Sequence, residues 1–236
     1  FKIINKMFEA INAANLFVKF GKTDLLLQLE PLKKREQLSK KLLEFDYRIQ
    51  LASLDNIKAK SKELLNTISE ELNTATSPID RLLLESISQL PKKINNQSTE
   101  LLASLDMCSF YIESGMYNNA ALATFDVIMR YTILTYQLEG KVMDNQNFIK
   151  EVLTKQIGKL PEFEAFYEKM LKLRDIRNSF AHTSITVTDT IISVHSIIEA
   201  FNIIRRTIVN DLFKNLPYIF PSPNSPLQPK PTKLQK

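Results

Sequence analysis

The sequence predicts an all-α fold, and two observations support this prediction. Apolar residues recur at intervals of three and four along most of the chain, as they do on amphipathic helices. Only four glycines occur among 236 residues, and none forms a glycine-rich phosphate loop, which argues against a nucleotide-binding α/β domain. Hydrophobic residues make up 44% of the chain, enough to form a core. We expect a helical N-terminal extension followed by a four-helix bundle.

Charge, cysteine content and hydropathy limit the ligands and the cellular compartment that we expect. The net charge of +5 allows attraction to a polyanion but does not single one out. The single cysteine, Cys108, excludes an internal disulfide and a thiolate zinc cluster. It favours a reducing intracellular compartment, cytoplasmic or nuclear. Asp126 and Arg130 interrupt the most apolar stretch, so we expect no membrane span. The sequence begins with Phe1 and not with Met, so we expect it to be a piece of a longer polypeptide or a processed chain.

Residues 1–90 are predicted to form the helical extension. The first helix covers residues 1–20 and ends at Gly21, and its predicted apolar face consists of Ile4, Phe8, Ile11 and Phe20. After Pro31, a second pattern predicts one long helix, as in a coiled coil, or an antiparallel helical hairpin. Its apolar positions are Leu38, Leu42, Phe45, Ile49, Ala52, Leu65, Ile68 and Leu72. A short helix begins at Ser77 and Pro78 and ends near Leu90.

The polar stretch Pro91–Glu100 predicts a domain boundary, and residues 96–216 are predicted to form the second domain. Its first helix has an apolar face of Leu101, Leu105, Cys108 and Ile112, and Gly115 ends it. The next helix begins near Asn118 or Asn119 and is apolar on most sides, which is typical of a central helix. Asp126 lies on one of its apolar stripes. It could pair with Arg130 or orient a catalytic group.

A third helix of this domain begins at Pro161 and carries an unusual arginine. Its apolar stripe is Phe163, Phe166, Met170 and Leu173, and the same spacing continues through position 177 to Phe180. Arg177 therefore falls on a core position, where its charge needs a carboxylate, carbonyls, water or a subunit boundary. His182 lies about 140° from Arg177 on an ideal helix. The two converge only if the helix ends or bends near Ala181, and the following Thr and Ser residues favour such an end.

The segment "RNSFAH", Arg177–His182, resembles the signature of the HEPN superfamily, the higher eukaryote and prokaryote nucleotide-binding helical domains. The resemblance extends over residues 96–214 and includes "YNNAALATFDVIMR", which is similar to a family helix with small residues and one acidic residue. It implies an HEPN-like four-helix bundle with the motif at the end of its third helix. Residues 1–90 lie outside the resemblance.

The resemblance implies a metal-independent endoribonuclease that acts as a homodimer, with two copies of the motif facing each other across a cleft. RNA is then the substrate, and no cofactor or metal is expected. In this reading His182 is the general acid and base, Arg177 binds phosphate, and Asn178 positions the substrate. Asp126 is a further candidate, as a group that orients the catalytic side chain. The implied roles are RNA processing, defence or toxin activity.

A noncatalytic function is the alternative interpretation of the same residues. Arg177 and His182 could satisfy carbonyls and end a helix in a dimerisation, RNA-binding or protein-interaction module. A histidine between apolar positions of a helix, such as His195, is more often packed or half-exposed than a second catalytic group. The basic run Leu32–Lys41 and the pair Lys92–Lys93 are more typical of solvated helix faces than of an RNA site, because aromatic residues are not interleaved with them.

The C-terminal residues 217–236 contain six of the ten prolines. Proline removes a backbone donor and breaks helices, so this segment is predicted to be a disordered tail or a linker. A protein partner could bind through this tail or through the N-terminal helices.

Overall fold

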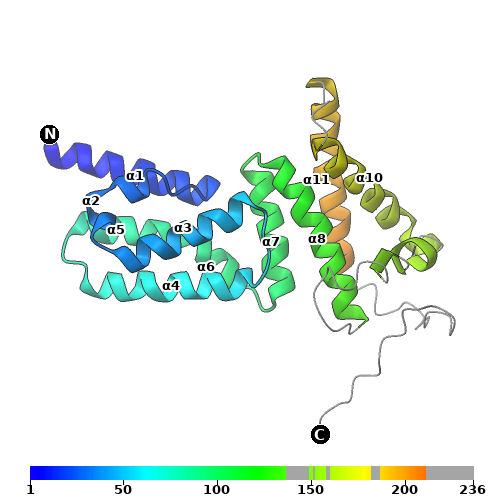
Figure 1. Ribbon diagram of the computed structural model, residues 1–236, viewed down its shortest axis with the longest axis horizontal. Coiled ribbons are helices and arrows are strands. Elements are labelled where there is room, and N and C mark those ends of the chain that lie inside the picture. The colour runs from blue at the N-terminus through cyan, green and yellow to red at the C-terminus, as the bar shows by residue number, and fades with distance from the viewer. Residues whose placement is uncertain (137–148, 151, 158–159, 182–186, 211–236) are drawn as a thin grey trace, which may run out of the picture. The chain divides into compact units, whose positions relative to one another are not determined.

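The computed structural model describes residues 1–136, 149–150, 152–157, 160–181 and 187–210 (Figure 1). All regular secondary structure in these residues is helical, which confirms the predicted all-α class. The chain divides into two compact units, Phe1–Thr124 and Phe125–Lys236. A search of the described residues found no helix long and apolar enough to span a bilayer.

The first unit contains a short 3₁₀ turn and eight α-helices, the last of which, α8, continues into the second unit. Their bounds are α1 Lys2–Phe20, η1 Leu26–Gln28, α2 Glu30–Lys33, α3 Glu36–Gln50, α4 Ile57–Thr74, α5 Pro78–Ile87, α6 Gln89–Asn95, α7 Glu100–Glu113 and α8 Tyr117–Thr135. The second unit contains the rest of α8, a π-helical turn Val152–Gln156, a 3₁₀ turn Pro161–Phe163, α10 Glu164–Ala181 and α11 Val187–Val209.

Helix α1 ends where the sequence predicts, but it buries a different face. Gly21 adopts a left-handed conformation at φ 67°, and its N–H donates to the Phe17 carbonyl at 2.8 Å. The helix packs against α5. The side chains that it buries are Ala10, Ala13, Ala14 and Phe17. The predicted face was wrong, because Ile4, Phe8 and Ile11 are exposed. Alanines allow two helices to approach closely, and this packing outweighed the more hydrophobic stripe.

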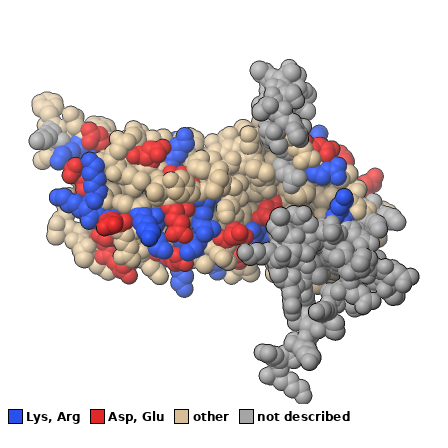
Figure 2. All heavy atoms as spheres, viewed as in Figure 1, with Lys and Arg blue, Asp and Glu red and all other residues tan. Residues whose placement is uncertain are grey.

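Helices α3 and α4 form the antiparallel hairpin that was one of the two predicted alternatives. Leu38, Leu42, Phe45 and Ile49 are buried as expected. On α4 the buried face is shifted by about one residue from the predicted one, to Ile57, Ser61, Leu64, Thr67 and Ile68. Ion pairs cross the hairpin, with Lys41 3.0 Å from Glu63 and Lys60 3.6 Å from Glu44. Figure 2 shows basic and acidic side chains interleaved over this pair.

A buried carboxylate fixes the chain before the hairpin. Asp46 of α3 accepts hydrogen bonds from both the backbone N–H of Thr23, at 2.9 Å, and its hydroxyl, at 2.7 Å. Asp46 is 7% exposed and Thr23 is fully buried. Because a buried donor without a partner costs about 1–3 kcal/mol, this contact holds the segment that follows α1 against α3.

The segment predicted as a polar boundary is partly helical. Helix α5 begins at Pro78 as predicted, although the Ser77 hydroxyl makes no capping hydrogen bond with a described residue. It ends at Ile87, and α6 follows directly, with Leu90, Pro91 and Ile94 buried. Proline is tolerated in the first turn of a helix, so Pro91 does not prevent α6 from forming. The predicted division at residues 91–100 remains a prediction, whereas the compact units divide the chain within α8.

Helices α7 and α8 close the first unit. Thr99 caps α7 by accepting a hydrogen bond from the N–H of Leu102 at 3.2 Å. The Tyr111 hydroxyl donates to the Ile49 carbonyl at 3.1 Å, and the Asn119 amide donates to the same carbonyl at 2.9 Å. These bonds satisfy a carbonyl at the C-terminal end of α3. Burial raises the pKa of the Tyr111 hydroxyl, which therefore stays a hydrogen-bond donor.

The second unit is built on the pairing of α10 and α11. Their buried side chains include Phe166, Met170, Leu173, Ile197, Ala200, Phe201 and Ile204. Lys169 of α10 lies 3.1 Å from Glu199 of α11. The hydrogen bond to Glu199 is the main reason that the pKa of Lys169 is raised, so the Lys169 ammonium stays charged at neutral pH.

Candidate functional site

The Arg177–His182 motif lies at the end of α10. The predicted apolar stripe of this helix is confirmed, since Phe163, Phe166, Met170 and Leu173 are buried. Ile176, at 8% exposure, extends the buried face to the residue before Arg177. The described part of α10 runs to Ala181, and the predicted end of the helix there stays a prediction, because residues 182–186 lie outside the described ones. The backbone thus places position 177 one turn after Leu173 and on the same side of the helix.

The side chain of Arg177 and the whole of His182 lie outside the described residues. Asn178 is described, and its side chain is exposed on α10 and engaged in an interaction. The predicted roles of Arg177, Asn178 and His182 therefore stay predictions.

Asp126 pairs with a neighbour on its own helix. The Arg130 guanidinium Nε donates to Asp126 Oδ2 at 2.5 Å, one turn along α8. The two side chains are 23% and 30% exposed, for Arg130 and Asp126 respectively. This is the ion pair that the sequence offered as the structural alternative. The same contact also fixes the orientation of the carboxylate, so the orienting role of Asp126 stays a prediction.

The other candidate residues in the sequence are exposed or paired with acidic side chains. His195 is exposed on α11. Within the basic run 32–41, Lys33 pairs with Glu30 at 3.2 Å and Lys41 with Glu63 at 3.0 Å. Lys93 pairs with Glu113 at 3.2 Å, and Lys92 is exposed. Lysines neutralised by nearby carboxylates attract RNA phosphates weakly, which favours the solvated-face interpretation.

Arg35, which belongs to the same basic run, connects several helices. Its guanidinium lies 2.8 Å from Glu71 and 3.0 Å from Asp80, and it donates to the Pro31 carbonyl at 2.9 Å. The side chain is only 13% exposed. Because one planar group contacts three separate segments, Arg35 joins the start of α3 to α4 and α5.

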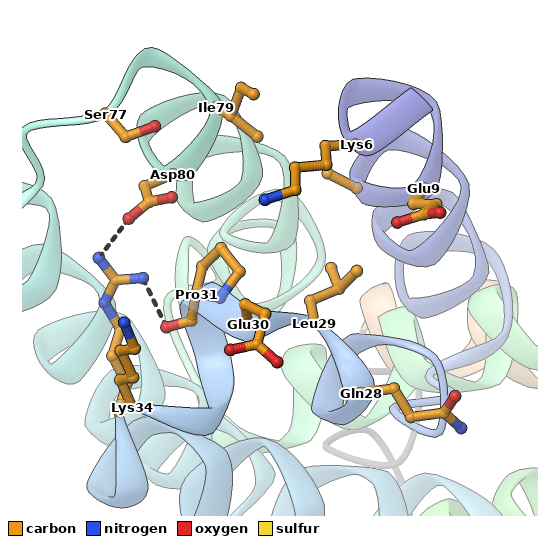
Figure 3. Close-up of a pocket in the computed structure, with 12 residues that line it drawn as sticks. Lys6, Glu9, Gln28, Leu29, Glu30, Pro31, Lys34, Ser77, Ile79 and Asp80 are labelled. Atoms are coloured by element: carbon orange, nitrogen blue, oxygen red, sulfur yellow. Dashed lines mark hydrogen bonds and ion pairs between the residues drawn. The ribbon is translucent and has the colours of Figure 1, made fainter. Parts of the chain in front are cut away.

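Beside Arg35 lies a cavity of about 590 Å³ that the sequence did not predict (Figure 3). Its walls come from α1, α2 with its flanking residues, and the start of α5. They include Lys6, Glu9, Glu30, Lys34, Ile79 and Asp80. In Figure 3 the Lys6 side chain extends from α1 toward the Asp80 side of the cavity. Sequence reasoning missed this feature because three segments distant in the chain form it.

The chemistry of this cavity does not indicate catalysis. Three basic and three acidic side chains line it, and Arg35 and Glu30 are already in ion pairs. The described lining residues include no histidine or cysteine, so they provide no familiar nucleophile and base pair. The charge balance does not select an anionic or cationic ligand, and the motif at the end of α10 remains the stronger candidate site.

The described fold and the motif thus define a helical protein whose candidate active site lies in its second unit. Comparison with known families adds information on the first unit. Residues 6–100 match the family model for the second domain of the CRISPR-associated protein MJ1674. The match covers α1 to α6, less than half of the 236-residue chain, and ends well before Arg177. No curated protein matches the chain.

Proposed function

We propose that this chain is the ribonuclease portion of a CRISPR-associated defence protein. It would cleave RNA without a metal ion, in a composite site formed by two copies of the chain. The observation that carries the proposal is the HEPN-like motif Arg177–His182 at the end of α10. Further support comes from the N-terminal part, which is similar to a domain of a protein described as CRISPR-associated.

The proposed reaction uses a nucleophile that RNA supplies. The 2′-hydroxyl oxygen attacks the adjacent phosphorus while His182 accepts its proton. The bond from phosphorus to the 5′-oxygen then breaks, and a protonated histidine donates a proton to that oxygen. General acid–base catalysis of this kind contributes about 100- to 10,000-fold. The products end in a 2′,3′-cyclic phosphate and a 5′-hydroxyl.

The remaining motif residues would stabilise and position the substrate. The planar guanidinium of Arg177 matches two phosphate oxygens and would offset the charge that develops on the pentacoordinate phosphorus. Asn178, which is exposed, would position the RNA, and Asp126 would orient the acid–base group. A twofold dimer explains why an arginine follows an apolar helix face, since that face would meet its copy around a polar pocket.

An RNA cleavage assay tests the proposal. The purified chain is incubated with single-stranded RNA of mixed sequence, with and without EDTA, and product ends are mapped. We expect the same products in both conditions, with cyclic phosphate ends. Intact RNA at high protein concentration would contradict the proposal and favour the noncatalytic module. Cleavage that EDTA abolishes would contradict the metal-independent mechanism.

A noncatalytic interaction module is the second candidate function. One observation favours it: a row of large apolar side chains is exposed on α1, which is typical of a protein-binding surface. This surface is compatible with either function.

A further inference from the structure

The cavity beside Arg35 is large enough to hold a small organic molecule. Its volume is about 590 Å³, and ligand pockets commonly measure about 300–1,000 Å³. All of its lining residues belong to the first unit, so the cavity is separate from the motif at the end of α10. Part of its wall is apolar and consists of Ala10, Leu29, Pro31 and Ile79. An apolar wall with a few charged groups is typical of small-molecule sites.

Half of the charged side chains in this cavity are available to a ligand. Three of the six already form ion pairs, namely Arg35, Asp80 and Glu30. The other three form no ion pair with another described residue, and they are Lys6, Lys34 and Glu9. The total charge of the lining therefore selects no ligand, but the unpaired groups do. They offer two ammonium groups and one carboxylate, with one positive charge in excess.

The unpaired charges are separated by sign across the cavity. In Figure 3 the ammonium groups of Lys6 and Lys34 lie on the side of Asp80 and Ser77, whereas the Glu9 carboxylate lies on the opposite side. The Ser77 hydroxyl makes no capping hydrogen bond within α5, so it can donate to a ligand. One side of the cavity thus suits an anion, and the other suits a cation.

We propose that this cavity binds a small phosphate monoester that also carries an amino group. The Lys6 and Lys34 ammonium groups would bind the phosphate oxygens, and the Ser77 hydroxyl would donate a further hydrogen bond. The ligand ammonium would pair with the Glu9 carboxylate. A phosphate dianion joined to an ammonium group has one net negative charge, which matches the single positive charge in excess among the unpaired groups. The apolar wall would contact the carbon skeleton between the two ends.

Two ligands of equal length test the amino end. Calorimetry measures the binding of 4-aminobutyl phosphate and of butyl phosphate to the full chain. We expect 4-aminobutyl phosphate to bind at least about tenfold more tightly, because only this ligand can pair with Glu9. Glu9→Gln should weaken the binding of 4-aminobutyl phosphate but not that of butyl phosphate, which carries no cation. Equal affinities of the two ligands for the wild type, or no binding of either at millimolar concentration, would overturn the proposal.

Lysine substitutions test the phosphate end. Lys6→Gln and Lys34→Gln should each weaken the binding of 4-aminobutyl phosphate at least about tenfold, because each removes a charge-assisted hydrogen bond. Lys19→Gln is the matched control, since Lys19 is exposed on the same helix as Lys6 and does not line the cavity. All three substitutions replace exposed side chains, so the variants should keep the wild-type circular dichroism and thermal midpoint.

Equal affinities of Lys6→Gln and Lys19→Gln for 4-aminobutyl phosphate would overturn the proposal, because the phosphate would then bind elsewhere on the chain. These experiments measure binding in the first unit and not RNA cleavage, so their failure leaves the proposed function open.

Discussion

Gly21 shows how a single residue sets the path of the chain after α1. Its φ of 67° lies in the left-handed region, and a Cβ at this position would lie 2.3 Å from Ile49 Cδ1. Gly115 has a similar φ of 70°, but a Cβ there would meet no atom within 4 Å. Both glycines therefore adopt a left-handed backbone conformation, but only Gly21 also lacks space for a side chain.

This pair gives a matched stability prediction. Gly115→Ala should lower the free energy of unfolding by about 1 kcal/mol through left-handed strain. Gly21→Ala should lower it by about 2–4 kcal/mol, because overpacking against Ile49 adds to that strain. Urea unfolding of both variants measures the difference. Equal losses would show that the α1–α3 corner relaxes around the added methyl group.

Asp126 allows a residue-scale test of its two roles. An i,i+4 pair of partly exposed side chains stabilises a protein by only about 0.3–1 kcal/mol, so Asp126→Asn and Arg130→Gln should both stay folded. If Asp126 orients the acid–base group, Asp126→Asn should reduce RNA cleavage at least about tenfold. Arg130→Gln should reduce it much less. Similar activity losses in the two variants would remove Asp126 from the site.

Only the parts of the candidate sites that follow from a local sequence pattern could be predicted. Periodicity from Phe163 to Leu173 located the buried face of α10. The helix end that the change in composition predicts after Ala181 borders residues outside the described ones and stays a prediction. The Asp126–Arg130 pair followed from one helical turn of spacing. The cavity beside Arg35 did not follow from any local pattern, because its walls are brought together only by tertiary packing.

At the scale of elements, an exposed charge network crosses the α3–α4 hairpin. Hydrogen bonds from Lys60, and then Lys41, lower the pKa of Glu63 below its ordinary value of 4.5. A carboxylate with a lowered pKa in the folded state stabilises the fold above its unfolded pKa. That contribution is lost as the pH falls through the folded pKa.

The acid stability of the hairpin is therefore predictable. Between about pH 6 and pH 3, the wild type should lose more unfolding free energy than Glu63→Gln, which has no proton to gain. Lys60→Gln should show an intermediate loss, because it removes the main cause of the shift. Chemical unfolding at several pH values measures this. Parallel losses in all three proteins would show that Glu63 is not coupled to folding.

Element positions were easier to predict from sequence than element faces. Gly21 gave the C-terminal end of α1 and Pro78 the start of α5, because glycine permits the left-handed conformation that ends a helix and proline fixes φ at a helix start. The face of α1 was wrong, since Ile and Phe outweigh Ala in a hydrophobicity pattern although Ala packs closely against a helix. Helix α6 was missed because its buried residues, Leu90, Pro91 and Ile94, are too few to establish a period.

At the scale of the molecule, the family match and the packing divide the chain differently. The match ends at residue 100, but α7 packs back on α4 and α6. The side chains of α7 that are buried in the whole chain are Ala103, Ser104, Leu105, Met107, Cys108, Phe110 and Tyr111. A fragment that starts at residue 96 would expose the part of this surface that faces α4 and α6.

This packing predicts the behaviour of the isolated second domain. A fragment of residues 96–216 should bind a hydrophobic dye and melt at a lower temperature than the whole chain, because α7 loses its partners. Dye fluorescence and circular dichroism on the two proteins measure this. A fragment as stable as the whole chain, without dye binding, would show that the contacts of α7 with α4 and α6 are dispensable.

The central claim concerns the chemistry of the Arg177–His182 motif, and one comparison tests it most directly. RNA cleavage is measured for wild type, His182→Ala and Arg177→Lys, each shown to be folded by circular dichroism. We predict that His182→Ala reduces the rate at least about 100-fold, because it removes the proton carrier. Arg177→Lys should also reduce turnover, since lysine keeps the charge but loses the planar fork. Cleavage by both variants at the wild-type rate would contradict the ribonuclease assignment.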